Sequence, residues 1–214
     1  FAPDGIFISS TTLGGTGGDM LRQLEVDDSG NIYAGGSFSG SAQFGNHSLT
    51  SAGSSDQFLV KMNPTGSVQW ARQVFGVDGS GSQAGLAVDA SGSVYLASSF
   101  TGEINFGPGT PTMTGTGARS SFVAKWDSTG TLQRADQIAG DDGVSIQGMA
   151  IGADGNLNLF GSLFGTADFD PSPGEAIRTS IGRQNSFILR LDSDYQFLDL
   201  LQIVRASGNV AALD

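Results

Sequence analysis

Two aspartates and a glutamate near the end of the chain are of the residue types that bind cations or catalyse hydrolysis. Asp168 and Asp170 flank Phe169, and Glu175 follows shortly after. In an extended segment alternate residues point to one side, so the two carboxylates lie together and Phe169 faces the other way. Carboxylate oxygens suit Ca²⁺, and carboxylate pairs also hydrolyse glycosides.

Asp168, Asp170 and Glu175 are therefore the candidate Ca²⁺ ligands. Turn or strand-edge structure is the favoured alternative for them. Catalysis is the weakest reading, because the sequence supplies no neighbour that would raise the pKa of either aspartate.

Further acids recur in short turns next to glycine. Aspartate and asparagine bond to the backbone two residues on, and glycine supplies positive φ, so these acids are expected to build turns. Calcium is again the functional alternative, but the EF-hand spacing with its distal glutamate is absent. The turn acids are Asp27, Asp28, Asp89, Asp127, Asp154, Asp192 and Asp194.

A cation recurs three residues after a phenylalanine, as Lys61, Lys125 and Arg190. A buried cation is costly unless it is paired. Asp27 and Asp89 are the expected partners in the first two cases, so an ion pair or an exposed head on a buried stem is predicted. A catalytic lysine is not expected in triplicate.

Other residue types narrow the chemistry further. The chain has no cysteine and one histidine, His47, which excludes thiol catalysis and His-rich metal sites. The glycine-rich run 79–85 is followed by no helix, so it is not a nucleotide-binding loop. Trp70 and Trp126 are expected in the core rather than in a sugar-binding platform.

The elements that must position these residues are repeats. A strand, a turn with glycine and a second strand occur three times, and the turn glycines Gly30, Gly92 and Gly155 are 62 and 63 residues apart. Such a period is typical of solenoids and propellers. The three copies are Leu24–Phe38, Leu86–Phe100 and Met149–Leu163.

Each unit contains four short apolar strands, which predicts an all-β fold of four-stranded antiparallel blades in a β-propeller-like repeat. Strands at 5–13 and 207–214 are expected to belong to incomplete blades. The expected segments are 1–19 (last strand of a preceding blade), 20–76, 77–140 and 141–205 (three full blades), and 206–214 (first strand of a further blade).

Three blades are too few for a ring, since propellers have about four to eight. The sequence leaves open a longer chain, several chains, or an extended stack of sheets with strand edges ready for pairing.

The charge composition of the chain limits the classes of partner that it can bind. The 214 residues have a formal net charge of −11, which would repel nucleic acid and anionic membranes. No apolar run is long enough to span a bilayer. An extracellular or salty environment suits such a surface.

The repeated segments V-D-D-S-G-N-I-Y-A-G-G-S-F, A-Q-F-G and S-S-D-Q-F-L-V-K-M-N-P-T-G resemble the bacterial β-propeller repeat family of the SBBP type. The segment D-F-D-P-S-P-G at Asp168–Gly174 is similar to a variant of the same repeat. The resemblance covers almost the whole chain. It implies a large secreted or cell-surface protein and a scaffold without a defined catalytic site.

The expected function is therefore a non-enzymatic scaffold or adhesion module that contacts a protein or polysaccharide at the cell surface. One alternative is a carbohydrate- or Ca²⁺-binding propeller that uses the inserts Gly40–Ser55, Gly102–Ser120 and Gly165–Ser186. A subunit of an extracellular filament is another, and a glycoside hydrolase or lyase using Asp168 and Asp170 is the weakest. No cofactor other than Ca²⁺ is expected.

Overall fold

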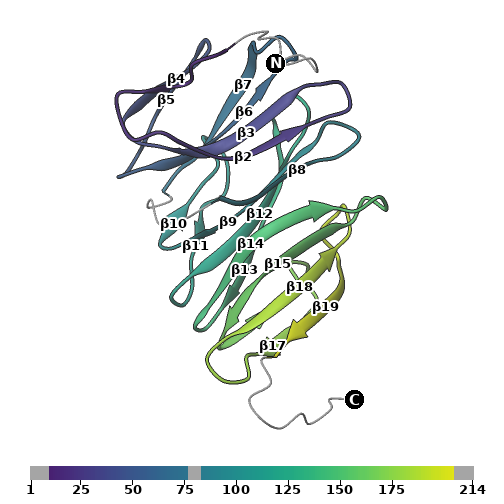
Figure 1. Ribbon diagram of the computed structural model, residues 1–214. Coiled ribbons are helices and arrows are strands. Elements are labelled where there is room, and N and C mark those ends of the chain that lie inside the picture. Colours follow the sequence, from purple (N-terminus) through teal and green to yellow (C-terminus); the bar gives the residue numbers. More distant parts are fainter. Residues whose placement is uncertain (1–9, 77–82, 205–214) are drawn as a thin grey trace.

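The computed structural model describes residues 10–76 and 83–204 (Figure 1). Within them all regular structure is β-strand, and every strand pairing is antiparallel. The all-β prediction is confirmed. None of the sheets closes on itself.

Three four-stranded meanders follow one another along the molecule (Figure 1). Sheet 1 has the order β2 (Met20–Val26), β3 (Ile32–Phe38), β6 (Asp56–Met62) and β7 (Val68–Val74). Sheet 2 has β8 (Gln83–Val88), β9 (Val94–Phe100), β12 (Ser120–Trp126) and β13 (Leu132–Gly140), and it continues past β13 into the short strands β16 (Thr166–Asp168) and β17 (Ile177–Thr179), which make it six-stranded. Sheet 3 has β14 (Gly143–Ile151), β15 (Leu157–Phe164), β18 (Asn185–Leu191) and β19 (Phe197–Ile203).

The insert between the second and third strand of each unit forms a small hairpin. These hairpins are β4 (Ser41–Phe44) with β5 (His47–Thr50), β10 (Glu103–Ile104) with β11 (Met113–Thr114), and β16 (Thr166–Asp168) with β17 (Ile177–Thr179). Sequence analysis did not predict strands here.

Each hairpin also pairs with the segment that comes shortly before the first strand of its own unit. The pairs are Gly14↔Gln43 between β1 (Gly14–Gly15) and β4, the bridge Phe75↔Asn105, and Ala139↔Asp168 between β13 and β16. Gly14 therefore has the same type of partner as the ends of the fourth strands of sheets 1 and 2.

The strands expected at the two ends of the chain lie largely or wholly outside the described residues. Most of the segment 5–13 lies outside the described residues, and 10–13 form no strand. The expected strand at 207–214 lies wholly outside them.

The hairpin turns form as the aspartate–glycine pattern predicts. The Asp27 Oδ1 atom accepts hydrogen bonds of 2.9 Å from the backbone N–H groups of Ser29 and Asn31, and Gly30 has a φ of 78°. The Asp89 turn repeats this with Ser91 and Ser93. These contacts are local, so sequence alone specifies them.

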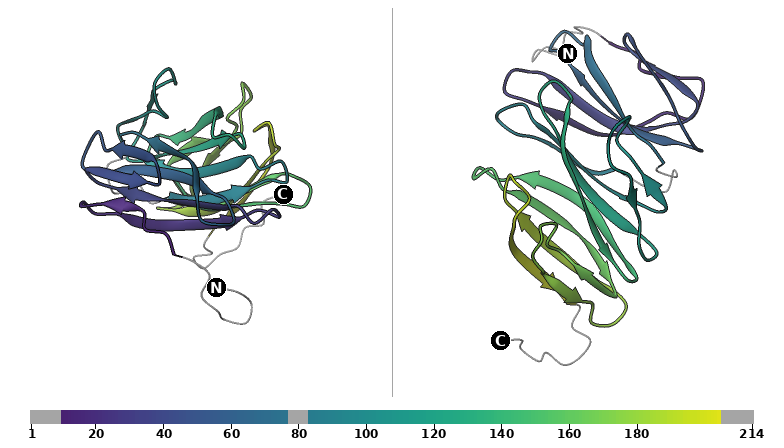
Figure 2. Two further views of the ribbon diagram at one scale, coloured as in Figure 1. Left: turned by 90° about the horizontal axis from the view of Figure 1, so that it is seen from above. Right: turned by 180° about the vertical axis from the view of Figure 1, so that it is seen from behind.

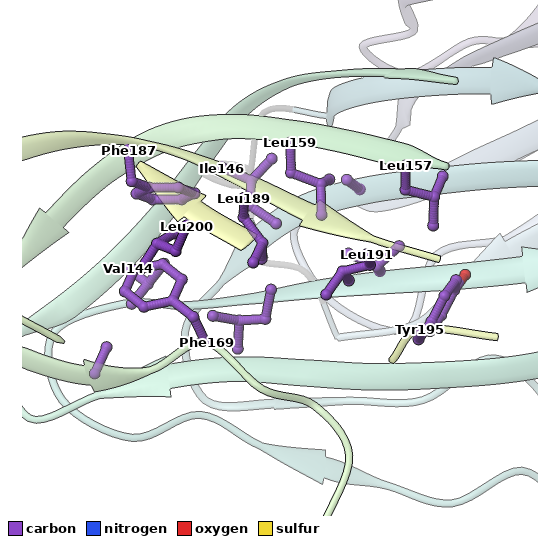
Figure 3. Close-up of a cluster of buried hydrophobic side chains, with 14 of the residues drawn as sticks. Val144, Ile146, Leu157, Leu159, Phe169, Phe187, Leu189, Leu191, Tyr195 and Leu200 are labelled. Atoms are coloured by element: carbon purple, nitrogen blue, oxygen red, sulfur yellow. The ribbon is translucent and has the colours of Figure 1, made fainter. Parts of the chain in front are cut away.

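Two clusters of the core lie between neighbouring sheets, and a third lies between sheet 1 and the β4–β5 hairpin, where Val60 packs with Phe44. We call the face toward the following sheet the forward face and the opposite one the backward face. Leu59 and Trp70 on the forward face of sheet 1 pack with Leu86, Leu96 and other residues of sheet 2. Val123 on the forward face of sheet 2 packs in the same way with sheet 3, and Figure 3 shows Leu157, Leu159 and Leu189 of sheet 3 in that cluster.

Candidate functional site

The candidate carboxylates at Asp168 and Asp170 are used to hold a loop. Asp168 Oδ1 accepts hydrogen bonds from the N–H groups of Asp170, at 3.0 Å, and Ala176, at 2.8 Å. Asp170 Oδ1 accepts one from Ser172 N–H at 2.9 Å. Phe169 between them is fully buried, as alternation predicts.

The expected Ca²⁺ site gains no support from this geometry. Within residues 10–76 and 83–204, no group of three or more His, Asp or Glu side chains is placed to hold a metal ion. Glu175 is exposed and Asp168 is occupied by backbone donors. Calcium binding at Asp168, Asp170 and Glu175 stays a prediction.

The recurring cations lie on tyrosine rings rather than on the turn aspartates. Lys61 Nζ is 5.1 Å from the ring centroid of Tyr33, and Lys125 Nζ is 4.9 Å from that of Tyr95. The predicted pairing with Asp27 and Asp89 is wrong because these carboxylates already accept hydrogen bonds from turn N–H groups and from the tyrosine hydroxyls.

In sheet 3 the equivalent cation does form an ion pair. Asn158 stands where the other units have tyrosine, and Arg190 Nη2 lies 3.1 Å from Asp154 Oδ2. The pair is half exposed, so it contributes little to stability.

Hydrogen bonds lower the pKa of the turn carboxyls. Burial alone would raise the pKa of Asp27 and Asp89, but hydrogen bonds from their turn residues and from a tyrosine hydroxyl outweigh it. The side-chain hydrogen bond of Thr129 has the largest effect on Asp127 and lowers its pKa. These carboxylates stay ionised at neutral pH, so they do not supply a protonated general acid.

A second set of contacts joins the sheets and was not foreseen from sequence. The backbone oxygen of Ser128, in the last turn of sheet 2, accepts hydrogen bonds from Trp70 Nε1 at 3.1 Å and Lys61 Nζ at 3.2 Å. Arg134 donates in the same way to the backbone oxygen of Asp194 in sheet 3. Trp70 and Arg134 occupy one position of the repeat, which is the signal that could have identified them.

Both tryptophans lie in the core, as expected. Trp70 is 5% exposed and Trp126 is 1% exposed. Neither offers an open ring face for stacking on a sugar.

An open hollow lies where the inserts of sheets 2 and 3 meet the first two strands of sheet 3, and we call it the loop groove. It has a volume of about 540 Å³ and is lined by Ala118, Arg119, Asp142, Ser145, Gln147, Ser162, Phe164, Arg183 and Gln184. Ala118, Arg119, Arg183 and Gln184 come from the inserts, and Ser145, Gln147, Ser162 and Phe164 come from the main strands β14 and β15.

Polar side chains converge inside the loop groove. Gln147 is the extra residue of a bulge in β14, and bulges redirect side chains. Its Nε2 atom donates to Ser162 Oγ at 3.0 Å, and Gln184 Nε2 donates to the same oxygen at 2.7 Å. Neither Arg119 nor Arg183 is ion-paired within the described part of the chain. The groove therefore presents two guanidinium groups and the Asp142 carboxylate, together with two amides that share the Ser162 hydroxyl.

Comparisons with known proteins add no assignment: no protein-family model matches the chain, and no curated protein matches it. In the part that the structure describes, no helix is long and apolar enough to cross a membrane.

Proposed function

We propose that the chain is a non-enzymatic scaffold or adhesion module of a secreted or cell-surface protein. In this proposal the three sheets are propeller-like blades, and the SBBP-type resemblance supports that arrangement. The observation that carries it is the division of labour between residues. Repeated side chains form the turns and the junctions between sheets, whereas Arg119 and Arg183 of the loop groove lie in inserts whose sequences do not repeat.

A rigid framework that displays variable loops is a common way to build a binding module. The net charge of −11 favours a soluble surface that avoids nucleic acid and anionic membranes. Partners are then a protein or a polysaccharide held by the loops.

The non-enzymatic assignment is tested with purified chain and a panel of polysaccharides. We expect no release of reducing sugar or unsaturated product. Turnover that is lost in the double variant Asp168→Asn with Asp170→Asn, without loss of thermal stability, would overturn the assignment in favour of a hydrolase or lyase.

The loop groove favours carbohydrate binding as a second candidate function. Guanidinium groups bind carboxylates with two parallel hydrogen bonds, and the amides of Gln147 and Gln184 suit hydroxyl groups. Arg119 and Arg183 therefore favour a sugar that carries a carboxylate. A glycan array with polyuronates and neutral glucans as probes is expected to show uronate binding.

A matched pair of variants locates that binding. Arg119→Ala with Arg183→Ala should abolish it, whereas Arg22→Ala with Arg178→Ala removes two positive charges from exposed positions elsewhere and should preserve it. An array without glycan binding would exclude the carbohydrate candidate and leave protein partners.

Calcium binding is tested by thermal unfolding. A ligand that binds only the folded chain raises its melting temperature. A rise with calcium that EDTA reverses, and that Asp168→Asn with Asp170→Asn removes, would establish the site. An unchanged melting temperature would exclude it.

A further inference from the structure

The forward face of sheet 3 carries an uncovered apolar row. Phe160, Ile188 and Leu201 lie directly opposite one another on β15, β18 and β19. They are 51%, 39% and 56% exposed. Aligned apolar side chains on neighbouring strands form a continuous surface, and such patches mark interaction sites.

The two internal junctions show what covers this face elsewhere in the molecule. Leu59 in sheet 1 and Val123 in sheet 2 occupy the position of Ile188, and each is 1% exposed. Both are covered by the backward face of the following sheet. The partner that fits the apolar row of sheet 3 is therefore another backward face of the same repeat.

Sheet 1 has such a face: its centre is buried, with Ala34 2% and Val60 0% exposed beneath Leu13 and the β4–β5 hairpin, and its outer strand β2 is uncovered. Leu24 and Val26 are 53% and 55% exposed, although Leu86, at the position of Leu24 in sheet 2, is only 2% exposed. A groove of about 500 Å³ runs over this surface, lined in part by Leu24, Ile32 and Met62. Sheets 1 and 3 lie at opposite ends of the molecule (Figure 2), so the uncovered strand β2 and the apolar row of sheet 3 are both available to another copy.

Polar contacts of the internal junctions also have counterparts at these ends. Lys61 donates to the backbone oxygen of Ser128 across the junction between sheets 1 and 2. Arg190 occupies the position of Lys61 in sheet 3, and Pro64 occupies the position of Ser128 in sheet 1. A proline retains its backbone oxygen, so Arg190 has an acceptor in the equivalent place.

We propose that two copies of this chain join head to tail, with the forward face of sheet 3 of one copy packed on the backward face of sheet 1 of the other. The contact repeats the junctions already present within the chain. It involves two different surfaces, so each copy keeps one free half until a ring closes.

This inference goes beyond the proposed function, because self-association requires no ligand in the loop groove. It is tested by measuring the mass of the purified chain against concentration, by light scattering or analytical ultracentrifugation. Association above the 21.9 kDa of a single chain is expected. A chain that stays monomeric at all accessible concentrations overturns the proposal.

Variants at the two faces define the contact. Ile188→Asp should raise the dissociation constant at least about tenfold, because burying an unpaired charge costs more than about 1.4 kcal/mol. Leu24→Asp should have the same effect from the other half. Ile177→Asp is the matched control, since Ile177 is 52% exposed on β17, which pairs with β16 and is not one of the four main strands of sheet 1 or sheet 3. Equal weakening by the control would contradict the assigned surfaces.

Mixing the two variants distinguishes a head-to-tail contact from a symmetric one or from misfolding. An Ile188→Asp chain keeps an intact backward face, and a Leu24→Asp chain keeps an intact forward face. Their mixture should form a dimer of one chain of each kind and grow no further. A mixture without such a dimer, from folded chains, overturns the head-to-tail arrangement.

Discussion

The junction between sheets 1 and 2 and the junction between sheets 2 and 3 are formed at the same positions of the repeat, but by different side chains. Between sheets 1 and 2, the strand β7 provides the large aromatic Trp70, and the turn that it meets has Gly130. Between sheets 2 and 3, the strand β13 has Arg134 instead, and the turn has Tyr195 in place of glycine. The large aromatic side chain is thus on the strand in the first junction and in the turn in the second.

Steric exclusion explains why the two substitutions occur together. A Cβ atom added to Gly130 would lie 2.8 Å from Cδ2 of Trp70, so a side chain in that turn is incompatible with tryptophan opposite. Tyr195 takes the turn glycine's conformation, with a φ of 60°, and is fully buried. Its ring lies 5.0 Å from Arg134 Cζ and 6.3 Å from the Tyr95 ring. Packing offsets the backbone strain that a non-glycine residue carries at positive φ.

The largest expected loss of stability comes from removing the Tyr195 side chain from the junction between sheets 2 and 3. Tyr195→Gly should lower the free energy of unfolding by about 3 kcal/mol, because deleting a buried aromatic costs about 3–5 kcal/mol and glycine relieves about 1 kcal/mol of strain. Urea denaturation measures the change. Tyr195→Phe is the control, since within the described residues the buried tyrosine hydroxyl has no hydrogen-bond partner. A loss as large in the control would show that the ring's packing is not the cause.

The next largest loss of stability is expected when a side chain is added at Gly130, in the junction between sheets 1 and 2. Gly130→Ala should cost about 2 kcal/mol, from backbone strain at a φ of 78° together with displacement of Trp70. Gly155→Ala should cost about 1 kcal/mol, because Gly155 has a φ of 79° but no atom within 4 Å of the added Cβ. Denaturant unfolding of both variants isolates the contact with Trp70. Equal losses would mean that this contact is unimportant.

The smallest effect concerns the first turn of each unit, where Asp27 and Asp89 correspond to Gly152. Asp89→Asn should cost about 1 kcal/mol at neutral pH, since asparagine keeps the turn bonds but loses their charge assistance, and part exposure limits the loss. Asp89 has a pKa below its ordinary 3.8 in the folded chain. Its contribution is therefore complete above that value and is lost as the pH falls through the lowered pKa.

Unfolding free energies of the variant and the parent at neutral and acidic pH should therefore converge in acid. Asp28→Asn removes the same charge from an exposed neighbouring turn position and should leave stability nearly unchanged at both pH values. A difference at Asp89 that persists in acid would assign the effect to shape rather than to charge.

The short hairpins that the inserts form were not predictable from the sequence. The main strands of each unit were predictable because their apolar runs and glycine turns are continuous in the chain. The insert hairpins have short strands of two to four residues, and β16 is fixed by pairing with β13 rather than by its own pattern. A strand that depends on a distant partner leaves a weak local signal.

Some features of the candidate sites were likewise predictable from the sequence, and others were not. Phe169 was expected to face away from Asp168 and Asp170, and it does, because alternation is a property of any extended segment. The ion pairs expected for Lys61 and Lys125 were wrong, because sequence spacing cannot show that the tyrosine rings on the adjacent strand lie beneath the two cations. The loop groove joins residues from two inserts and from sheet 3, so it was visible only in three dimensions.

The sequence by itself determined the repeat, the antiparallel strands and the aspartate–glycine turns, since each depends on residues a few positions apart. Only the tertiary structure decided which side chains cross from one sheet to the next. Trp70 and Ser128 are 58 residues apart in sequence, and their contact exists because two sheets pack face to face. Packing acts on the combined volume of both partners, which is why Trp70 with Gly130 and Arg134 with Tyr195 are equivalent solutions.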